Sequence, residues 1–290
     1  MKKIELPEYV LADIPNQVRT ALEEDVGSGD ITAQLIGADT RAEARIISRE
    51  SAVMCGRAWA DEVFRQLGGD VTLTWLVSDG DAVTPDQVLC ELAGNARQIL
   101  TGERSALNFL QTLMGTATAT RNYVDAVAGK GVTILDTRKT LPGLRTAQKY
   151  AVLCGGGNNH RLALHDAFLI KENHIAACGS IPAAIREARR LAPGKRITIE
   201  VETLDEFRLA MAAGPDQVML DEFSAEDTAT ALAECGADSP TIELSGSFTL
   251  ERLRALPALS RPVVISIGAI TKHLAATDLS LRLHASSATG

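Results

Sequence analysis

Short apolar runs alternate with stretches of helical periodicity throughout the second half of this chain, and this alternation restricts the possible folds most strongly. Strands that are separated by helices pair in parallel through right-handed crossovers. The pattern therefore predicts a parallel α/β sheet, either doubly wound or curved into a barrel, although six units are slightly few for a full eight-stranded barrel. The six runs are 132–135, 168–170, 197–201, 218–220, 242–244 and 263–267.

The first hundred residues have a different pattern. Turn signals rich in glycine and aspartate surround three stretches with strand character, at 44–48, 71–77 and 87–92. Helical patterns lie at 15–24 and 58–66. We therefore predict an α+β domain with an antiparallel sheet in this part of the chain.

A long helical pattern joins the two parts. It runs from about residue 102 to residue 128, and its leucines are spaced to form one apolar face. We place the domain boundary along this helix, which gives a first domain of residues 1–113 and a second of residues 114–290. The C-terminal tail is also a candidate to pack back on the first domain.

The composition argues against several classes of protein. A net charge of −8 and 4% aromatic residues provide neither the basic surface nor the stacking platforms of a nucleic-acid-binding protein. The N-terminal segment lacks the apolar core of a signal peptide, and no window approaches the ~20 apolar residues of a membrane helix. The five cysteines form no Cys-x-x-Cys pair, which argues against a disulfide framework and a zinc ribbon. We expect a cytoplasmic protein without nucleic-acid or membrane partners.

One segment of this acidic chain concentrates positive charge. Between Asp136 and Lys171, six lysines and arginines outnumber two acids, which gives the segment a net charge of +4. An excess of this size predicts a small, highly anionic ligand. Arginine offers a planar fork to carboxylates and lysine a point charge to phosphates, so the mixture suits ligands that carry both groups. For each cation alone, the alternative is a solvated surface charge.

Polar or small residues follow the predicted strands of the second domain. In a parallel α/β sheet, the ligand lies outside the carboxyl ends of the strands. These residues are therefore expected to converge on one site, together with the cations His160 and Arg161. They are Arg138, Lys139, Lys171, Glu200, Glu202, Asp221, Ser245, Gly246 and Gly268.

The non-cationic members of this set have two interpretations each. Glu200 and Asp221 are either ion-pair partners, or they hold ribose hydroxyls or a metal and stabilise positive charge on a sugar carbon. The small residues at 245–246 and 268 either bind phosphate through backbone N–H groups or simply begin a helix. The three glycines at 155–157 lack dinucleotide-binding spacing and are expected to make a sharp turn. Zinc-binding and nucleophile motifs do not occur.

Several motifs, spread over essentially the whole chain, carry a family resemblance. They are Glu24-Asp25-Val26-Gly27 with Gly29-Asp30-Ile31-Thr32, Gly102-Glu103-Arg104-Ser105-Ala106-Leu107-Asn108, Asp136-Thr137-Arg138-Lys139-Thr140, Asn159-His160-Arg161 and Ile170-Lys171-Glu172-Asn173-His174. Together they resemble the quinolinate phosphoribosyltransferase family of decarboxylating nicotinate-nucleotide pyrophosphorylases. The resemblance implies an N-terminal α+β sandwich domain followed by an incomplete parallel α/β barrel, assembled as a homodimer or a higher oligomer with shared active sites.

The resemblance implies a reaction in NAD biosynthesis. Quinolinate and 5-phosphoribosyl-1-pyrophosphate (PRPP) react in the presence of Mg²⁺ to give nicotinate mononucleotide, pyrophosphate and carbon dioxide. By resemblance, the catalytic residues are Lys139, Lys171, Glu200 and Asp221, of which the two acids also contact ribose and the PRPP-bound Mg²⁺. The implied substrate-binding residues are Arg104 of the partner subunit, Thr137, Arg138, Lys139, His160, Arg161, Lys171, Glu200, Asp221, Ser245, Gly246 and Gly268.

Two positions depart from the commonest pattern of this family. The chain has Leu220-Asp221-Glu222 where members often have Leu-Asp-Asn, and Ser245-Gly246-Ser247 where they often have Ser-Gly-Asn. Glu222 adds a negative charge near an anion site, whereas the hydroxyl of Ser247 can still hydrogen-bond.

Three other functions were compared with this one. A Schiff base on Lys171 would make the protein an aldolase-like lyase, but one reactive lysine leaves Arg104 and Arg138 unexplained. A pyrophosphorylase-like protein of molybdenum transport would share the fold, but the motifs around His160 and Lys171 favour quinolinate. A non-catalytic binding protein would leave the polar strand ends without a purpose.

Overall fold

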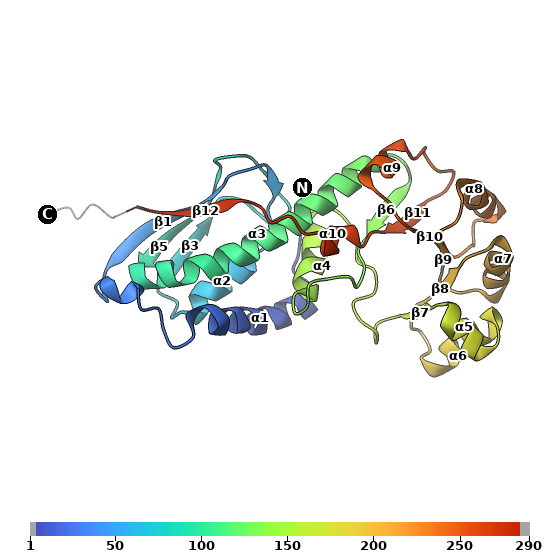
Figure 1. Ribbon diagram of the computed structural model, residues 1–290, viewed down its shortest axis with the longest axis horizontal. Coiled ribbons are helices and arrows are strands. Elements are labelled where there is room, and N and C mark those ends of the chain that lie inside the picture. The colour runs from blue at the N-terminus through green and yellow to red at the C-terminus, as the bar shows by residue number, and fades with distance from the viewer. Residues whose placement is uncertain (1–3, 285–290) are drawn as a thin grey trace. The chain divides into compact units, whose positions relative to one another are not determined.

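The computed structural model of the chain describes residues 4–284, which divide into two compact units (Figure 1). The first unit extends to Arg121 and also contains Thr140–Gly156 and the chain from Ala269 onward. The second unit consists of Asn122–Lys139 and Gly157–Gly268. The chain therefore passes between the units several times.

The first unit contains a four-stranded sheet that is antiparallel, as the sequence predicts, and that has one strand more than the three predicted. Its strand order is β12-β1-β5-β3, and a separate antiparallel pair is formed by β2 and β4. The C-terminal strand β12 pairs along β1, so both ends of the described chain belong to this unit. The strands are β1 (Arg41–Ser48), β2 (Ala52–Val53), β3 (Val71–Trp75), β4 (Ala82–Val83), β5 (Val88–Asn95) and β12 (Leu279–His284).

Helices of the first unit meet around the buried side chain of Trp59. The indole Nε1 of Trp59 donates a hydrogen bond to Oε1 of Gln17 at 2.7 Å, and its ring lies 5.8 Å from that of Tyr150, centroid to centroid. These contacts join three helices in one apolar core. The helical elements are α1 (Glu8–Val26), η1 (Ala33–Leu35), α2 (Arg57–Gln66), α3 (Ala96–Ala126), α4 (Arg145–Cys154) and α10 (Ala269–Lys272).

The glycines after α4 allow the sharp turn that the sequence predicts. A Cβ on Gly155 would lie 2.5 Å from the carbonyl oxygen of Ala117 on α3, so any side chain there would displace backbone. Gly156 has a φ of +92°, which favours glycine. The chain therefore packs closely against α3 and then turns toward His160.

The second unit is built on a parallel six-stranded sheet, and all six predicted strands are present. The strand order is β6-β11-β10-β9-β8-β7. Because β6 and β7 are its two edges, strand pairing within residues 4–284 leaves the barrel open, which confirms the predicted incomplete barrel. The strands are β6 (Val132–Leu135), β7 (Phe168–Ile170), β8 (Ile197–Val201), β9 (Gln217–Asp221), β10 (Thr241–Ser245) and β11 (Val263–Ser266).

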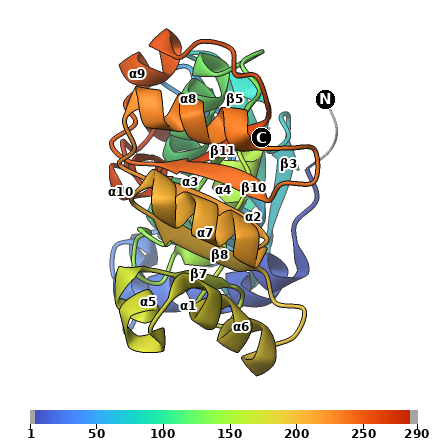
Figure 2. The ribbon, with the colours of Figure 1, turned by 90° about the vertical axis from the view of Figure 1, so that its right-hand side faces the viewer.

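Helices of the second unit follow the strands and cover one face of the sheet, with α7 and α8 in front of it in Figure 2. Four of them begin at a serine or threonine whose hydroxyl accepts a backbone N–H, as Thr203 does from Glu206. Such caps satisfy donors that a helix start leaves open and fix where each helix begins. The helices are α5 (Glu172–Cys178), α6 (Ile181–Leu191), α7 (Leu204–Ala213), α8 (Ala225–Glu234) and α9 (Leu250–Ala255).

Candidate active site

The carboxyl ends of the parallel strands surround a cavity of about 350 Å³ in the second unit. Four lysines and arginines line it with two carboxylates, so its surface is predominantly cationic. Most of the residues that the sequence places in a common site do converge here. The lining residues are Thr137, Arg138, Lys139, His160, Arg161, Leu169, Lys171, Glu200, Met219, Glu243, Ser245 and Ser266.

Three other predicted site residues adjoin this lining, two of them through close contacts and Gly246 as the chain neighbour of Ser245. Asp221 accepts a 2.8 Å hydrogen bond from the hydroxyl of Ser245. A Cβ on Gly268 would lie 2.9 Å from Cδ of Lys139, and a Cβ on Gly246 would lie 3.3 Å from Oε2 of Glu222. Both glycines therefore give neighbouring charged side chains room.

Two further predicted residues are not among those that line the cavity. Glu202, which the sequence analysis expected to converge with the others, is exposed directly after β8. Arg104 belongs to the first unit. It is exposed on α3, and no hydrogen bond or ion pair of its side chain is found within residues 4–284. Its guanidinium is therefore available to a ligand or to another molecule.

Two motifs of the site are interlocked by one buried carboxylate. Asp136 is fully buried and accepts hydrogen bonds from Nδ2 of Asn159 at 2.7 Å and from the backbone N–H of His160 at 2.9 Å. Asn158 also forms a parallel bridge with Leu135 at the end of β6. Segments that lie more than twenty residues apart in the sequence are therefore fixed side by side at the cavity.

Arg138 and Arg161 bring two positive charges to the same part of the cavity. Burial, followed by repulsion from Arg138, lowers the pKa of the Arg161 guanidinium. Nε of Arg138 is buried and has no hydrogen-bond partner in the described part of the chain. An anion bound between them would relieve the repulsion and satisfy this donor.

Lys171 and Glu200 form an ion pair beside these arginines. Nζ of Lys171 lies 2.6 Å from Oε2 of Glu200, whose side chain is only 9% exposed while that of Lys171 is 43% exposed. The pair leaves the ammonium partly open to the cavity. It holds a carboxylate and a cation together at the ends of β7 and β8.

Four lining residues lie outside the set that the sequence analysis selected. Each of them precedes a selected residue by two positions, and alternate residues of a strand point to the same face. The two-residue period of a strand could therefore have identified these four lining residues from the sequence. The pairs are Leu169 with Lys171, Met219 with Asp221, Glu243 with Ser245, and Ser266 with Gly268.

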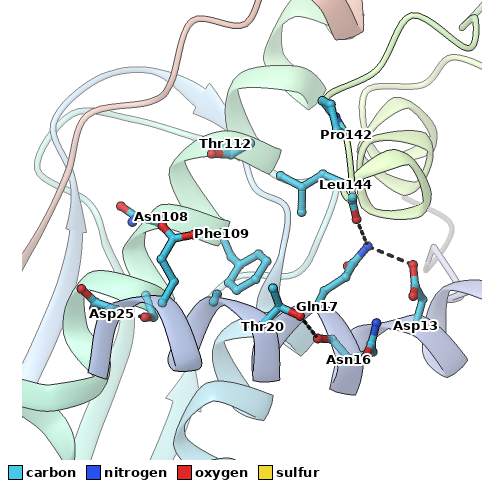
Figure 3. A pocket seen from close by; sticks show the side chains of 14 residues that line it. Asp13, Asn16, Gln17, Thr20, Asp25, Asn108, Phe109, Thr112, Pro142 and Leu144 are labelled. Atoms are coloured by element: carbon cyan, nitrogen blue, oxygen red, sulfur yellow. Dashed lines mark hydrogen bonds between the residues drawn. The ribbon is translucent and has the colours of Figure 1, made fainter. Parts of the chain in front are cut away.

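A larger cavity of about 610 Å³ lies in the first unit, between α1, α3 and residues 142–144 (Figure 3). Its lining includes the acids Asp13, Glu24 and Asp25 and contains no lysine or arginine. This lining is unsuited to an anionic substrate. The cationic cavity of the second unit is therefore the better candidate site.

One group of possible metal ligands was found among the described residues, and it also lies in the first unit. Cys55, Asp79 and Cys154 bring their ligand atoms within 4.8 Å of one another. Both thiols are buried, and the hydroxyl of Tyr150 donates to Asp79 at 2.9 Å. None of the three residues lines the cationic cavity.

The fold and the site together define an α/β protein with a cationic pocket at the carboxyl ends of parallel strands, the place where ligands bind in such folds. None of the helices in residues 4–284 is both long and apolar enough to cross a membrane. The chain belongs to the quinolinate phosphoribosyltransferase family of pentosyltransferases. The family model of the N-terminal domain matches residues 30–114, and that of the C-terminal domain matches residues 116–282.

Relatives from several bacteria match almost the whole chain. The probable nicotinate-nucleotide pyrophosphorylase (carboxylating) of Bacillus subtilis is 41% identical over 261 residues, which are 89% of each chain. The corresponding Mycobacterium leprae protein is 40% identical and covers 92% of this chain and 95% of its own. The structure of nicotinate-nucleotide pyrophosphorylase from Francisella tularensis superposes with a TM-score of 0.89 at 44% identity, covering 98% of this chain and 100% of that one.

Proposed function

We propose that this protein transfers the phosphoribosyl group of PRPP to the ring nitrogen of quinolinate and releases one carboxylate as carbon dioxide. The products are nicotinate mononucleotide and pyrophosphate, and the reaction belongs to NAD biosynthesis. Family membership and the names of the relatives support this reaction. The structural observation that supports this reaction most directly is the pair of neighbouring guanidinium groups of Arg138 and Arg161 at the cavity.

Quinolinate carries two adjacent carboxylates, and we assign them to Arg138 and Arg161, with Lys171 nearby. A guanidinium binds a carboxylate through two parallel N–H donors. Two guanidiniums that repel each other in a partly buried site discriminate in favour of a dianion. Nicotinate has one carboxylate and would leave one of these cations without a partner.

The phosphates of PRPP are assigned to Lys139, Lys171 and the small residues after β10 and β11. The hydroxyl of Thr137 accepts from the backbone N–H of Lys139 at 3.0 Å, which shapes the turn after β6. Because Gly268 has no side chain, the side chain of Lys139 can lie against the backbone that follows β11. Lysine presents a rotatable point charge, which suits phosphate oxygens.

Catalysis in this scheme depends on positioning and electrostatics. As pyrophosphate leaves, positive charge develops on the sugar carbon. We assign its stabilisation to Glu200, which lines the cavity, and to Asp221, which accepts a hydrogen bond from the lining residue Ser245. The nitrogen then attacks this carbon. Once it carries the sugar, the ring is cationic and stabilises the electron pair that departing carbon dioxide leaves on the ring carbon. That carbon then takes a proton from water to give the product, so no covalent enzyme intermediate is needed.

Lys171 does not suit the alternative Schiff-base chemistry. A Schiff base needs a free amine, whereas Nζ of Lys171 is held in an ion pair with Glu200. Mass spectrometry of the enzyme stopped during turnover tests the non-covalent scheme. A covalent glycosyl or imine adduct on the protein would contradict it.

Mg²⁺ is the implied metal, and the carboxylate oxygens of this site fit it. Glu200 and Asp221 offer hard oxygen ligands, and one oxygen of each already has a hydrogen-bond donor that orients the group. We assign these two residues to the Mg²⁺ that accompanies PRPP. The ion would supply charge neutralisation for the pyrophosphate.

We also propose a cytoplasmic homodimer in which Arg104 serves the active site of the partner subunit. Its exposed guanidinium on α3 supports this role. The five cysteines, all within the described residues, are free thiols, which agrees with a reducing compartment. Mixing an Arg104→Ala subunit with a subunit inactivated at Arg138 tests the shared site, because mixed dimers would regain activity that neither parent has.

The reaction itself is tested with purified protein, quinolinate, PRPP and Mg²⁺. We expect nicotinate mononucleotide, pyrophosphate and carbon dioxide in equal amounts, measured by chromatography and by release of labelled carbon dioxide. Absence of the nucleotide under these conditions would overturn the proposed function.

A further inference from the structure

We propose that Glu243, a buried residue of β10, is a positioning residue that fixes the proton of His160 on Nε2 and thereby holds the backbone of Arg161 in place. The consequence for catalysis rests on the proposed function, because Arg161 is assigned to a carboxylate of the substrate. The proton position itself is a property of the free protein and is tested without substrate.

The hydrogen bonds of His160 determine where its proton lies. The backbone N–H of Arg161 donates to Nδ1 of His160 at 2.7 Å, so Nδ1 is an acceptor and carries no proton. Nε2 lies 3.2 Å from Oε2 of Glu243. The ring proton therefore belongs on Nε2, where it is donated to the carboxylate.

Glu243 is built to act as an acceptor at this position. Its side chain is fully buried, and the same Oε2 also accepts from the side-chain amide of Gln217 at the start of β9. Oε1 of Glu243 has no partner in residues 4–284. The oxygen of Gln217 accepts in turn from Arg196 at 2.8 Å, so the amide orientation is fixed as well.

The polar chain ends at the cationic wall of the cavity. It runs from Gln217 through Glu243 and His160 to the backbone N–H of Arg161. The guanidinium of Arg161 is held at its other end by the carbonyl of Ala167, at 3.3 Å. With both its ring nitrogens engaged in this chain, His160 orients the backbone of Arg161, which lines the same cavity as Arg138.

Labelling of the histidine ring nitrogens with ¹⁵N tests the proton position in the free, unmodified protein. We expect the His160 signals of a neutral ring protonated on Nε2 at pH 7. Signals of the Nδ1–H tautomer, or of a doubly protonated ring, would overturn the proposal. This result does not depend on any variant or on the proposed reaction.

Variants of Glu243 test the consequence for the site. Glu243→Leu removes the acceptor, and we expect the His160 ¹⁵N signature to change and kcat/KM for quinolinate to fall roughly 10- to 100-fold, the usual range for loss of a partner behind a functional side chain. Glu243→Gln keeps an amide oxygen that can accept from His160 and Gln217. It is expected to restore the signature and most of the activity.

A matched control separates positioning from general damage to the barrel interior. Thr198 of β8 is also fully buried, and its hydroxyl has no hydrogen-bond partner among the described residues. Thr198→Val should leave both the His160 signature and kcat/KM within about twofold of the wild type. The proposal is wrong if folded Glu243→Leu protein keeps the wild-type signature, or if Glu243→Gln restores neither readout.

Discussion

Nζ of Lys171 and Oε2 of Glu200 are 2.6 Å apart, at the ends of the paired strands β7 and β8. From the sequence alone, Glu200 has two interpretations, an ion-pair partner or a group that acts on the sugar. The structure contains the ion pair, and the carboxylate also lines the cavity. The two interpretations are therefore compatible, because the pair orients Glu200 beside the proposed substrates.

We expect Glu200→Gln to lower kcat by about 100-fold or more, the usual effect of removing one electrostatic stabiliser of a transition state. The amide has nearly the same shape but no charge, so binding of quinolinate should change much less. Steady-state kinetics with both substrates measures the difference. Glu202→Gln is the control, because Glu202 is exposed and does not line the cavity; equal losses would refute the role of Glu200.

Arg138→Ala is expected to cost far more activity than Arg145→Ala. Arg138 lines the cavity together with Arg161, whereas Arg145 begins α4 in the first unit and donates to Thr140 at 3.2 Å. Arg138→Ala should lower kcat/KM for quinolinate by about 100-fold, as is usual when one partner of a buried charge pair is removed. Arg145→Ala should lower it a few-fold at most. Similar losses in the two variants would show that proximity to strand ends does not select site residues.

Glu222→Asn should stabilise the fold. Glu222 has a φ of +51°, a left-handed conformation that costs most side chains about 1 kcal/mol and that asparagine tolerates better. We expect the free energy of unfolding to rise by about 0.5–1 kcal/mol, measured by urea denaturation. The control Glu251→Asn lies on α9, where asparagine is the poorer helix former, and should give no gain.

The acid Asp79 is expected to make stability depend on pH. Burial raises its pKa above the ordinary 3.8, although the hydrogen bond from Tyr150 opposes this effect. The native state then binds the proton more tightly than the unfolded chain, so the contribution of Asp79 to stability falls as the pH rises from about 3.8 through the raised pKa. The free energy of unfolding of Asp79→Asn, relative to that of the wild type, should therefore increase between pH 4 and pH 8. A difference that is independent of pH would contradict this account.

Much of the barrel could be predicted because each of its strands is a short apolar run between helical patterns. The order of the strands in the sheet could not be predicted. Nothing in the apolar run 132–135, which forms β6, indicates that it pairs with β11 rather than with β7. The short strands β2 and β4 also escaped prediction, because two-residue pairs have no measurable periodicity.

The site was predictable where charge marks a strand end, as at Arg138 and Lys171. It was less predictable where a residue of the cavity lining lies deeper in a strand. Glu243 is two positions before the end of β10 and has no charged neighbour in the sequence, and its role depends on hydrogen bonds to Gln217 and His160 from distant segments. Only the folded sheet brings these groups together.

The most direct test of the central claim compares quinolinate with nicotinate as acceptors of the phosphoribosyl group. If Arg138 and Arg161 form a site for two carboxylates, kcat/KM for quinolinate should exceed that for nicotinate by at least about 100-fold, because a site built for a polar group strongly rejects the analogue that lacks it. Nicotinate that reacts as efficiently as quinolinate would contradict the account.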